Sequence, residues 1–384
     1  MKFKIHIPYL LKAIGVALSV VLALGLSACT DNGTPDMPGQ PEETLAELTL
    51  RIGAVRGGKS GSRSQSDEFE APSFTQENIR FLRVIIVRPS GIVEHNRLLA
   101  FNGRTDLVRY TFKVKPAEKK QIYLIANEPA STEATLSSVT EGLAFNSTVI
   151  EGLTLTRPAG TPLIDNTGSS SAWVPMSEHF EVDVKSTADG LKEQTENLFI
   201  TRAAVKFSFT FRAGTPDMPY EGHGFEISAI RITNMSSAEY LFPKATVYSP
   251  AKELPSNNPL QGRRITSYAT PANPAPVPFT YTVSGITAGP GTAQYSPAIY
   301  LPESIAGTAG TYQLSVAYRE KDGKGGYLQS EPVWFGPEPL AMTDLPRNTH
   351  VYINTTLTKS GIYPKVTIEP FKSVALDPDF GFDD

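Results

Sequence analysis

The chain of 384 residues contains a single cysteine, Cys29, and this scarcity excludes several kinds of chemistry. No disulfide can form within the chain, and the part that follows Cys29 has neither a cysteine-based zinc cage nor a cysteine nucleophile. Without disulfides, the chain must be stabilised by its hydrophobic core alone. The length is sufficient for about two or three domains.

Histidines are also few, since only four follow residue 28: His95, His179, His223 and His350. No two of them have the spacing of metal ligands, and none lies in a His-Glu-x-x-His pattern. Ser177, Glu178 and His179 are adjacent, but neighbours on a strand point to opposite faces, which is the wrong geometry for a catalytic triad. We therefore expect no enzyme, no cofactor and no metal site.

Long apolar runs are confined to the N-terminus. Three lysines, Lys2, Lys4 and Lys12, precede an apolar run over residues 13–26. This run is too short for a membrane span and long enough for a signal-peptide core. The run ends in Leu-Ser-Ala-Cys, which resembles a bacterial lipobox, so we expect lipidation of Cys29 after removal of residues 1–28. An ordinary signal peptide or a single-span anchor is the alternative. Residues 29–45 are polar and rich in Pro and Gly, which predicts a flexible tether.

An excess of positive charge is missing as well. Loss of residues 1–28 removes three lysines and no acid, so the formal net charge changes from −4 to −7. This balance argues against nucleic acid as a partner. Trp173 and Trp334 are the only tryptophans, and they are far apart in sequence. Because a glycan platform needs clustered aromatic side chains, a glycan-binding surface lipoprotein is kept only as an alternative.

Short alternating runs separated by Gly, Pro, Asn and Asp clusters fill the chain from residue 46 onward, a pattern typical of β-sandwiches. Residues 48–55 alternate, and residues 81–87 form a denser run that we expect to be buried on both faces. Val205, Phe207, Phe209 and Phe211 recur at period two within a long run over residues 198–211. Residues 130–152 carry the main helical pattern. We expect an all-β protein with this short helical segment in its N-terminal domain. The polar stretch 185–194 divides the predicted domains, 46–194 and 195–384.

Two segments are unusual for a sandwich. Residues 56–66 are small and basic, with Arg56 and Arg63, and they directly follow the first strand, so they suit an extended protease substrate. A plain loop is the alternative. The tail, residues 363–384, places Val366, Ile368, Val374 and Leu376 at one parity around Pro370, which suits an edge or inserted strand. A cut after the first strand would open a groove that a strand of another chain could fill.

Seven pieces of the sequence, in order, resemble the fimbrillin family, the Bacteroidales type V pilus subunits related to the Porphyromonas major and minor fimbriae. They are NIRFLRVIIV (78–87), KKQIYLIAN (119–127), VPMS (174–177), TRAAVKF (201–207), IRITN with YLFP (230–234 and 240–243), YLPES (300–304) and RNTHVYIN (347–354). The resemblance covers most of the chain after the tether.

The resemblance implies two transthyretin-like β-sandwich domains and export to the outer membrane as a lipoprotein. It implies cleavage by an arginine-specific protease after Arg63, or after Arg56, and assembly with other fimbrial subunits by a C-terminal donor strand. The expected function is that of a structural subunit of an extracellular fimbria that supports adhesion. A tip adhesin or an anchor subunit on the same scaffold is a further alternative.

Overall fold

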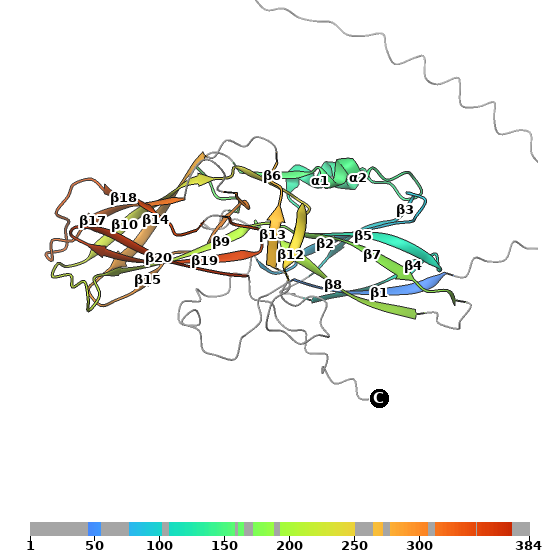
Figure 1. Cartoon of the computed structure of the whole chain (residues 1–384), viewed down its shortest axis with the longest axis horizontal. Helices are drawn as coiled ribbons and strands as arrows, with labels where there is room; N and C mark the ends of the chain where they lie inside the picture. The colour runs from blue at the N-terminus through green and yellow to red at the C-terminus, as the bar shows by residue number, and fades with distance from the viewer. Residues whose placement is uncertain are drawn as a thin grey trace, which may run out of the picture. The chain divides into compact units, whose positions relative to one another are not determined.

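In the computed structural model, strands dominate and the two helices are short (Figure 1). The structure describes residues 45–54, 77–101, 107–157, 160–164, 172–187, 193–249, 264–271, 277–305, 312–342 and 344–370, all within one compact unit, Thr44–Asp384. No helix within these ranges is long and apolar enough to cross a membrane. The expectation of an all-β fold is confirmed.

The first half of the described chain contains eight strands and both helices. Their bounds are β1 Ala46–Ala54, β2 Phe81–Val87, β3 Val93–Ala100, β4 Leu107–Val114, β5 Glu118–Ala126, α1 Ala130–Ser137, α2 Ser147–Glu151, β6 Thr154–Thr156, β7 Met176–Val184 and β8 Glu193–Arg202. Both helices lie within the predicted helical segment, residues 130–152.

Seven of these strands hydrogen-bond in the order β3-β2-β5-β7-β8-β1-β4. Only two residue pairs, Met176 with Arg202 and Ser177 with Thr201, join β7 to β8. The strands on either side of this short junction pack against each other, since Leu48, Leu50 and Ile52 of β1 share a core with side chains of β2 and β5. The result is a sandwich of two layers.

The helices cover the opposite face of β2 and β5 (Figure 1). Leu136 of α1 and Ile150 of α2 pack with Ile85, Tyr123 and Ile125 in a second core. This second core explains the dense apolar pattern of residues 81–87, which Arg83 alone interrupts. After Phe81, every side chain of β2 is buried, because both faces of the strand are covered.

The second half contains twelve strands. Their bounds are β9 Val205–Ala213, β10 Phe225–Met235, β11 Ala238–Tyr240, β12 Ala245–Ser249, β13 Arg264–Tyr268, β14 Val277–Ala288, β15 Gln294–Tyr295, β16 Ile299–Leu301, β17 Gln313–Glu320, β18 Val333–Pro339, β19 Thr349–Thr358 and β20 Gly361–Pro370. A sheet of order β14-β10-β17-β18 faces the sheet that contains β15-β9-β19-β20 and β16.

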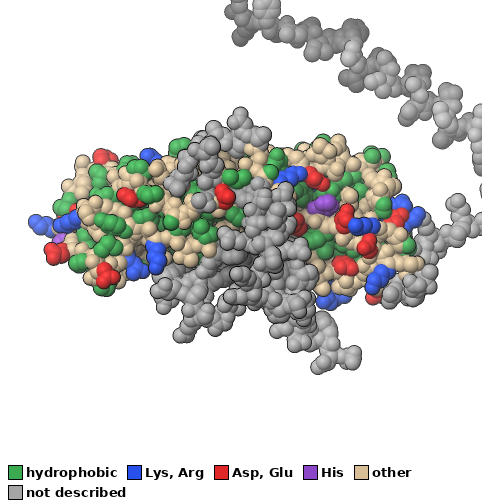
Figure 2. Space-filling model, viewed as in Figure 1, with side chains coloured by type: hydrophobic (Ala, Val, Ile, Leu, Met, Phe, Trp, Pro, Cys, Tyr) green, Lys and Arg blue, Asp and Glu red, His purple; other side chains and the backbone are tan. Residues whose placement is uncertain are grey.

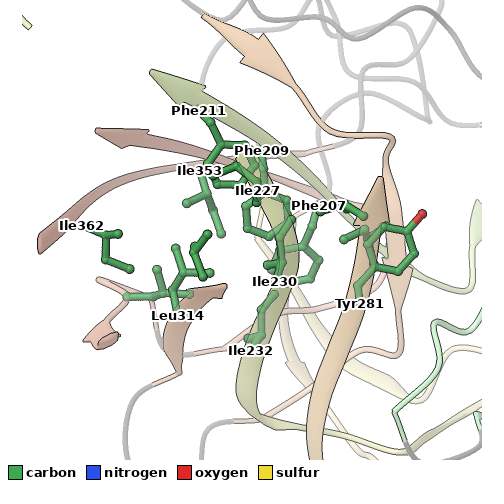
Figure 3. Close-up of a cluster of buried hydrophobic side chains, with 14 of the residues drawn as sticks. Phe207, Phe209, Phe211, Ile227, Ile230, Ile232, Tyr281, Leu314, Ile353 and Ile362 are labelled. Atoms are coloured by element: carbon green, nitrogen blue, oxygen red, sulfur yellow. The ribbon is translucent and has the colours of Figure 1, made fainter. Parts of the chain in front are cut away.

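The core between these two sheets is built on the phenylalanines of β9. Phe207, Phe209 and Phe211 are buried in one row, as their period of two predicts, and Figure 3 shows them beside Ile227 and Ile230 of β10. The long run 198–211 is not one strand, however. It breaks at Ala203 and Ala204, and β8 joins the first sandwich whereas β9 joins the second. Strand β8 spans the predicted domain division at residues 194 and 195, which stays a prediction.

Candidate functional site

Strand β1 lies between two strands that are distant from it in sequence. It pairs in parallel with β8, from Glu47 opposite Glu193 to Ala54 opposite Ile200. On its other side it pairs antiparallel with β4, from Ala46 opposite Val114 to Gly53 opposite Leu107. Both ladders run along almost the whole of β1, so the first strand is an interior strand of the sandwich.

The side chains of β1 alternate as the sequence pattern predicts. Leu48, Leu50 and Ile52 are completely buried, and they face the core formed with β2, β5 and β7. Burial of an aliphatic side chain contributes about 1.5–3 kcal/mol, so these three residues make β1 an important part of the core. Thr49, on the opposite face, exchanges a hydrogen bond with the hydroxyl of Thr111 on β4 at 2.8 Å.

Strand β4 relies on β1 for its backbone pairing to a greater extent than β8 relies on β1. Among the strands that the structure describes, only β1 pairs with β4, whereas β8 also pairs with β7 at its end. Removal of β1 would therefore leave unpaired backbone groups along both β8 and β4, and it would uncover the apolar row beneath. A gap of one missing strand spans about 10 Å, or two strand spacings.

The chain downstream of the basic segment is fixed at Glu77, the first described residue after residue 54. Its carboxylate accepts a hydrogen bond from Lys206 of β9 at 2.7 Å and one from the hydroxyl of Tyr300 of β16. Arg202 of β8 lies 3.7 Å away. Burial by itself would raise the pKa of Glu77, but the charges of Arg202 and Lys206 together with these hydrogen bonds hold that pKa below its ordinary value.

A second buried charge cluster lies between β11 and the start of β19. The guanidinium of Arg347 bonds the carboxylate of Glu303 at 2.8 Å and also donates to the backbone carbonyls of Tyr240 and Leu241. Glu239 lies 3.9 Å from the same guanidinium, and the side chains of all three charged residues are almost completely buried. Burial raises the pKa of Glu239, whereas Glu303 helps to raise the pKa of Arg347 above its ordinary value against the opposing effect of burial.

This cluster connects the second sandwich to the first. Strand β11 pairs with β6, and Leu241 and Phe242 enter the core beneath α1 and α2. Ser177 of β7 donates a hydrogen bond to the carbonyl of Leu241. Arg347 therefore holds a segment of the second half in a core of the first. Its surroundings are those of a structural ion cluster, since the charged side chains are buried and paired with one another.

The predicted site residues are only partly within the described ranges. Cys29, Arg56, Arg63, Val374 and Leu376 lie outside them. Val366 and Ile368 lie in β20, where they pair with Ile353 and Val351 of β19. Val366 is partly buried against the core, whereas Ile368 is 37% exposed. Strand β20 is thus an edge strand of the protein's own second sandwich.

Sequence analysis missed Glu77, Arg347 and the partners of β1. The pieces that carry the family resemblance held a signal for two of these features, because Lys206, Glu303 and Arg347 all lie in them. A charged residue inside an otherwise apolar strand or next to one is often buried and paired. No pattern in the sequence indicated that Glu77 is the common partner of Lys206 and Arg202, since the contact spans 129 residues.

No group of histidine, cysteine or acidic residues in the described ranges could hold a metal ion. On the face shown in Figure 2, basic and acidic side chains are interspersed among the described residues.

The fold and the site define an all-β protein of two sandwiches whose first strand completes the core of the first sandwich. This fold is shared by a proposed cell adhesion protein from Parabacteroides distasonis ATCC 8503, with a TM-score of 0.54, 14% identity, and coverage of 86% of this chain and 98% of that one. At the level of the fold, this similarity agrees with the resemblance found in the sequence.

Two structures from Porphyromonas gingivalis are also similar, with TM-scores of 0.47. The tip fimbrial protein Mfa3 with a C-terminal truncation is 14% identical, covering 84% of this chain and 99% of that one. A fimbrilin, FimA, from strain W83 is 13% identical, and the match covers 86% of this chain and 99% of that one. No family model and no curated protein matches the chain.

Proposed function

We propose that this protein is a structural subunit of a surface fimbria that supports adhesion. In this proposal it is exported as a lipoprotein, matured by proteolytic removal of its first strand, and assembled with other fimbrial subunits by donor-strand exchange. The observation that carries the proposal is the position of β1, the first strand of the described residues, which is an interior strand with paired strands on both sides. The fold shared with a proposed cell adhesion protein supports the same function.

An N-terminal interior strand is well suited to replacement. A strand in the middle of the chain has covalent connections at both ends, but β1 is connected to the body only through residues 55–76. Arg56 is the second residue after the last residue of β1, and Arg63 is the ninth. A cut after either arginine would leave β1 held by non-covalent contacts alone. The loss of Leu48, Leu50 and Ile52 would then be offset by a donor strand with apolar side chains at alternate positions.

The body keeps its attachment on the other side of the cut. Glu77 is bound by Lys206 and Tyr300 of the second half, so the chain that leads into β2 stays in place when β1 leaves. This anchor supports removal of the first strand as a maturation step, because the residues that lead into β2 are held by the second half and not by β1.

The C-terminal segment is the proposed donor. Val366 and Ile368 have the alternation of a donor strand, and in the single chain they pair with β19. Donation by these two residues therefore requires β20 to leave β19, whereas donation by Val374 and Leu376 does not. The exposed side chain of Ile368 and the position of β20 at a sheet edge favour contact with a neighbouring chain.

Lipid attached to Cys29 would place the precursor in the outer membrane, and an arginine-specific protease would release it into the fibre. The decisive experiment is N-terminal sequencing of protein from the cell surface, together with electrophoresis in SDS without heating. We expect a mature start at Ser64, or at Gly57 if Arg56 is used, and ladders that resist SDS. The double variant Arg56→Ala/Arg63→Ala should keep its first strand and form no ladder, while Lys59→Ala in the same segment should behave as the wild type.

The glycan-binding alternative gives the opposite result, a lipidated, full-length monomer that forms no ladder. A start at Cys29 in assembled fibres would instead identify an anchor subunit that keeps β1. Uncut monomers at the surface of cells that bear fibres would overturn the proposal.

A further inference from the structure

Strands β3 and β4 are the two outermost strands of the seven-stranded order, yet side chains of β3 bind the backbone of β4 and of the residue that follows it. We infer that these contacts hold β4 in place when β1 is absent, so that the groove stays open for an incoming strand. We name the pair His95 and Glu94, with their contacts to Lys113 and Lys115, the β4 clip. This inference rests on the proposed function and adds the residues that keep the groove ready.

The first contact of the β4 clip comes from His95. The Nε2 atom of its ring lies 2.7 Å from the backbone carbonyl oxygen of Lys113. Because a carbonyl oxygen only accepts, the ring nitrogen donates this hydrogen bond. The ring also packs against Phe112 of β4, with 5.4 Å between ring centroids, and Phe112 is buried in the core beneath β1. The side chain of His95 thus contacts both the backbone of β4 and a side chain of β4 that lies in the core.

The second contact comes from Glu94. One carboxylate oxygen accepts a hydrogen bond from the backbone amide of Lys115 at 2.6 Å, one residue beyond the end of β4. The other oxygen lies 2.7 Å from the ammonium group of Lys120. Lys120 is fully buried and also binds Glu118 at 2.7 Å. A buried ion pair of this kind fixes the position of the Glu94 carboxylate, so the amide of Lys115 meets an acceptor that cannot easily move.

These contacts matter most when β1 is missing. With β1 present, β4 has a ladder of backbone hydrogen bonds from Leu107 to Val114. Without β1, the described strands offer β4 no ladder at all. The contacts that the structure describes for β4 are then the side chains of Val108, Phe112 and Val114 in the core and the β4 clip. A strand held only by buried side chains can shift toward β8 and close the gap. The β4 clip opposes that shift because it holds the end of β4 on the side away from β8.

The occupant of the groove can be probed with the protein's own first strand. The full chain is cut after Arg63 with an arginine-specific protease, the released fragment is removed in mild urea, and the remainder is returned to buffer. A labelled peptide with the sequence of β1, AELTLRIGA, is then titrated by fluorescence anisotropy. The wild type should bind it. In His95→Phe, which keeps the packing on Phe112 but has no ring nitrogen, the dissociation constant should rise about tenfold, as expected for one lost hydrogen bond.

Glu94→Ala should weaken binding of the peptide to a similar extent, and His95→Gln, which keeps an N–H donor, should recover part of the affinity. The uncut variants should melt within a few degrees of the uncut wild type, because the β1 ladder then holds β4. Exposed residues supply matched controls. His223 is an exposed residue of the second sandwich, so His223→Phe should not change peptide binding. Glu181→Ala breaks an exposed ion pair with Lys119 on β5, and it should not change peptide binding either.

The outcomes separate this inference from the function it rests on. If the trimmed wild type binds the peptide and both His95→Phe and Glu94→Ala bind it equally well, the β4 clip has no role and the inference is overturned, while strand exchange stands. The inference also fails if the two substitutions lower the free energy of unfolding of the uncut protein by as much as they weaken the free energy of peptide binding after the cut. The contacts are then ordinary structural contacts. A trimmed wild type that binds no peptide overturns both proposals, because no groove then exists.

Discussion

The ammonium group of Lys206 lies 2.7 Å from the carboxylate of Glu77, although 129 residues separate the two in sequence. This ion pair joins β9, the first strand of the second sandwich, to the residues that lead into β2 of the first. It also marks the point at which the described body resumes after residue 54. The contact therefore bears on both the stability of the protein and the proposed removal of β1.

Replacement of Glu77 by Gln should lower the free energy of unfolding at pH 7 by about 3 kcal/mol, since two buried cations, Arg202 and Lys206, lose a negatively charged neighbour. The folded pKa of Glu77 lies below the unfolded value of 4.5, so its contribution is complete above that pH and is lost as the pH falls through the lowered pKa. Urea denaturation of the wild type and the variant should converge in acid. The exposed Glu221→Gln provides the control, and a difference that does not shrink as the pH falls below 4.5 would contradict the assignment.

Arg347 should be among the most sensitive positions in the second half. Its replacement by Met leaves Glu303 buried without its partner, so we expect a loss of about 3–5 kcal/mol in the free energy of unfolding. The double variant Arg347→Met/Glu303→Gln should recover part of this loss. Arg109→Met, at an exposed position of β4, should change stability by less than about 0.5 kcal/mol. Equal effects of Arg347→Met and Arg109→Met would show that the buried cluster does not stabilise the fold.

Replacement of Cys29 by Ala should abolish lipid attachment, because the predicted lipid acceptor is the thiol of the only cysteine. Metabolic labelling with a radioactive fatty acid, followed by separation of membrane and soluble fractions, measures both lipidation and retention. Ser27→Gly, a change between small residues before the cysteine, should leave labelling intact. Undiminished labelling of Cys29→Ala would rule out a lipoprotein modified at this position.

The tail can be tested by separating the edge strand from the residues beyond it. Deletion of residues 371–384 retains β20, so the chain should fold and melt normally but lose donor activity if Val374 and Leu376 are needed. Deletion from Val366 onward also removes the pairs with Ile353 and Val351, and it should lower the melting temperature. Circular dichroism and a polymerisation assay distinguish the two effects.

Ile368→Asp tests the donor role within β20. Because Ile368 is 37% exposed in the single chain, the charge should cost little stability there, whereas it would be buried in a neighbour's groove. We expect a folded monomer that polymerises at least tenfold more slowly. Lys365→Asp, at an exposed position of the same strand, is the matched control. Normal polymerisation of Ile368→Asp would exclude this side chain from the donor interface.

Local pattern in the sequence was enough to predict the strand content, the faces of the strands and the helical segment. The alternation in residues 48–55 placed Leu48, Leu50 and Ile52 in a core, and the period of two in β9 placed its three phenylalanines in another. These features depend on the geometry of a single strand, in which successive side chains point to opposite faces.

Pairing between distant strands was decided only by the tertiary structure. Nothing in β1 indicates that it pairs in parallel with β8, because a period of two specifies which side chains are buried and not which strand lies alongside. The same limit applies to the tail, where one pattern fits both an edge strand and a donor strand. It also applies to the run 198–211, which passes from the first sandwich to the second at Ala203 and Ala204. The contacts of Glu77, of Arg347 and of the β4 clip likewise require the folded chain, since each joins residues that only long-range packing brings together. The sequence by itself thus determined the class of fold and the faces of its strands, whereas the packing of distant strands decided which strand can be exchanged and what holds its groove.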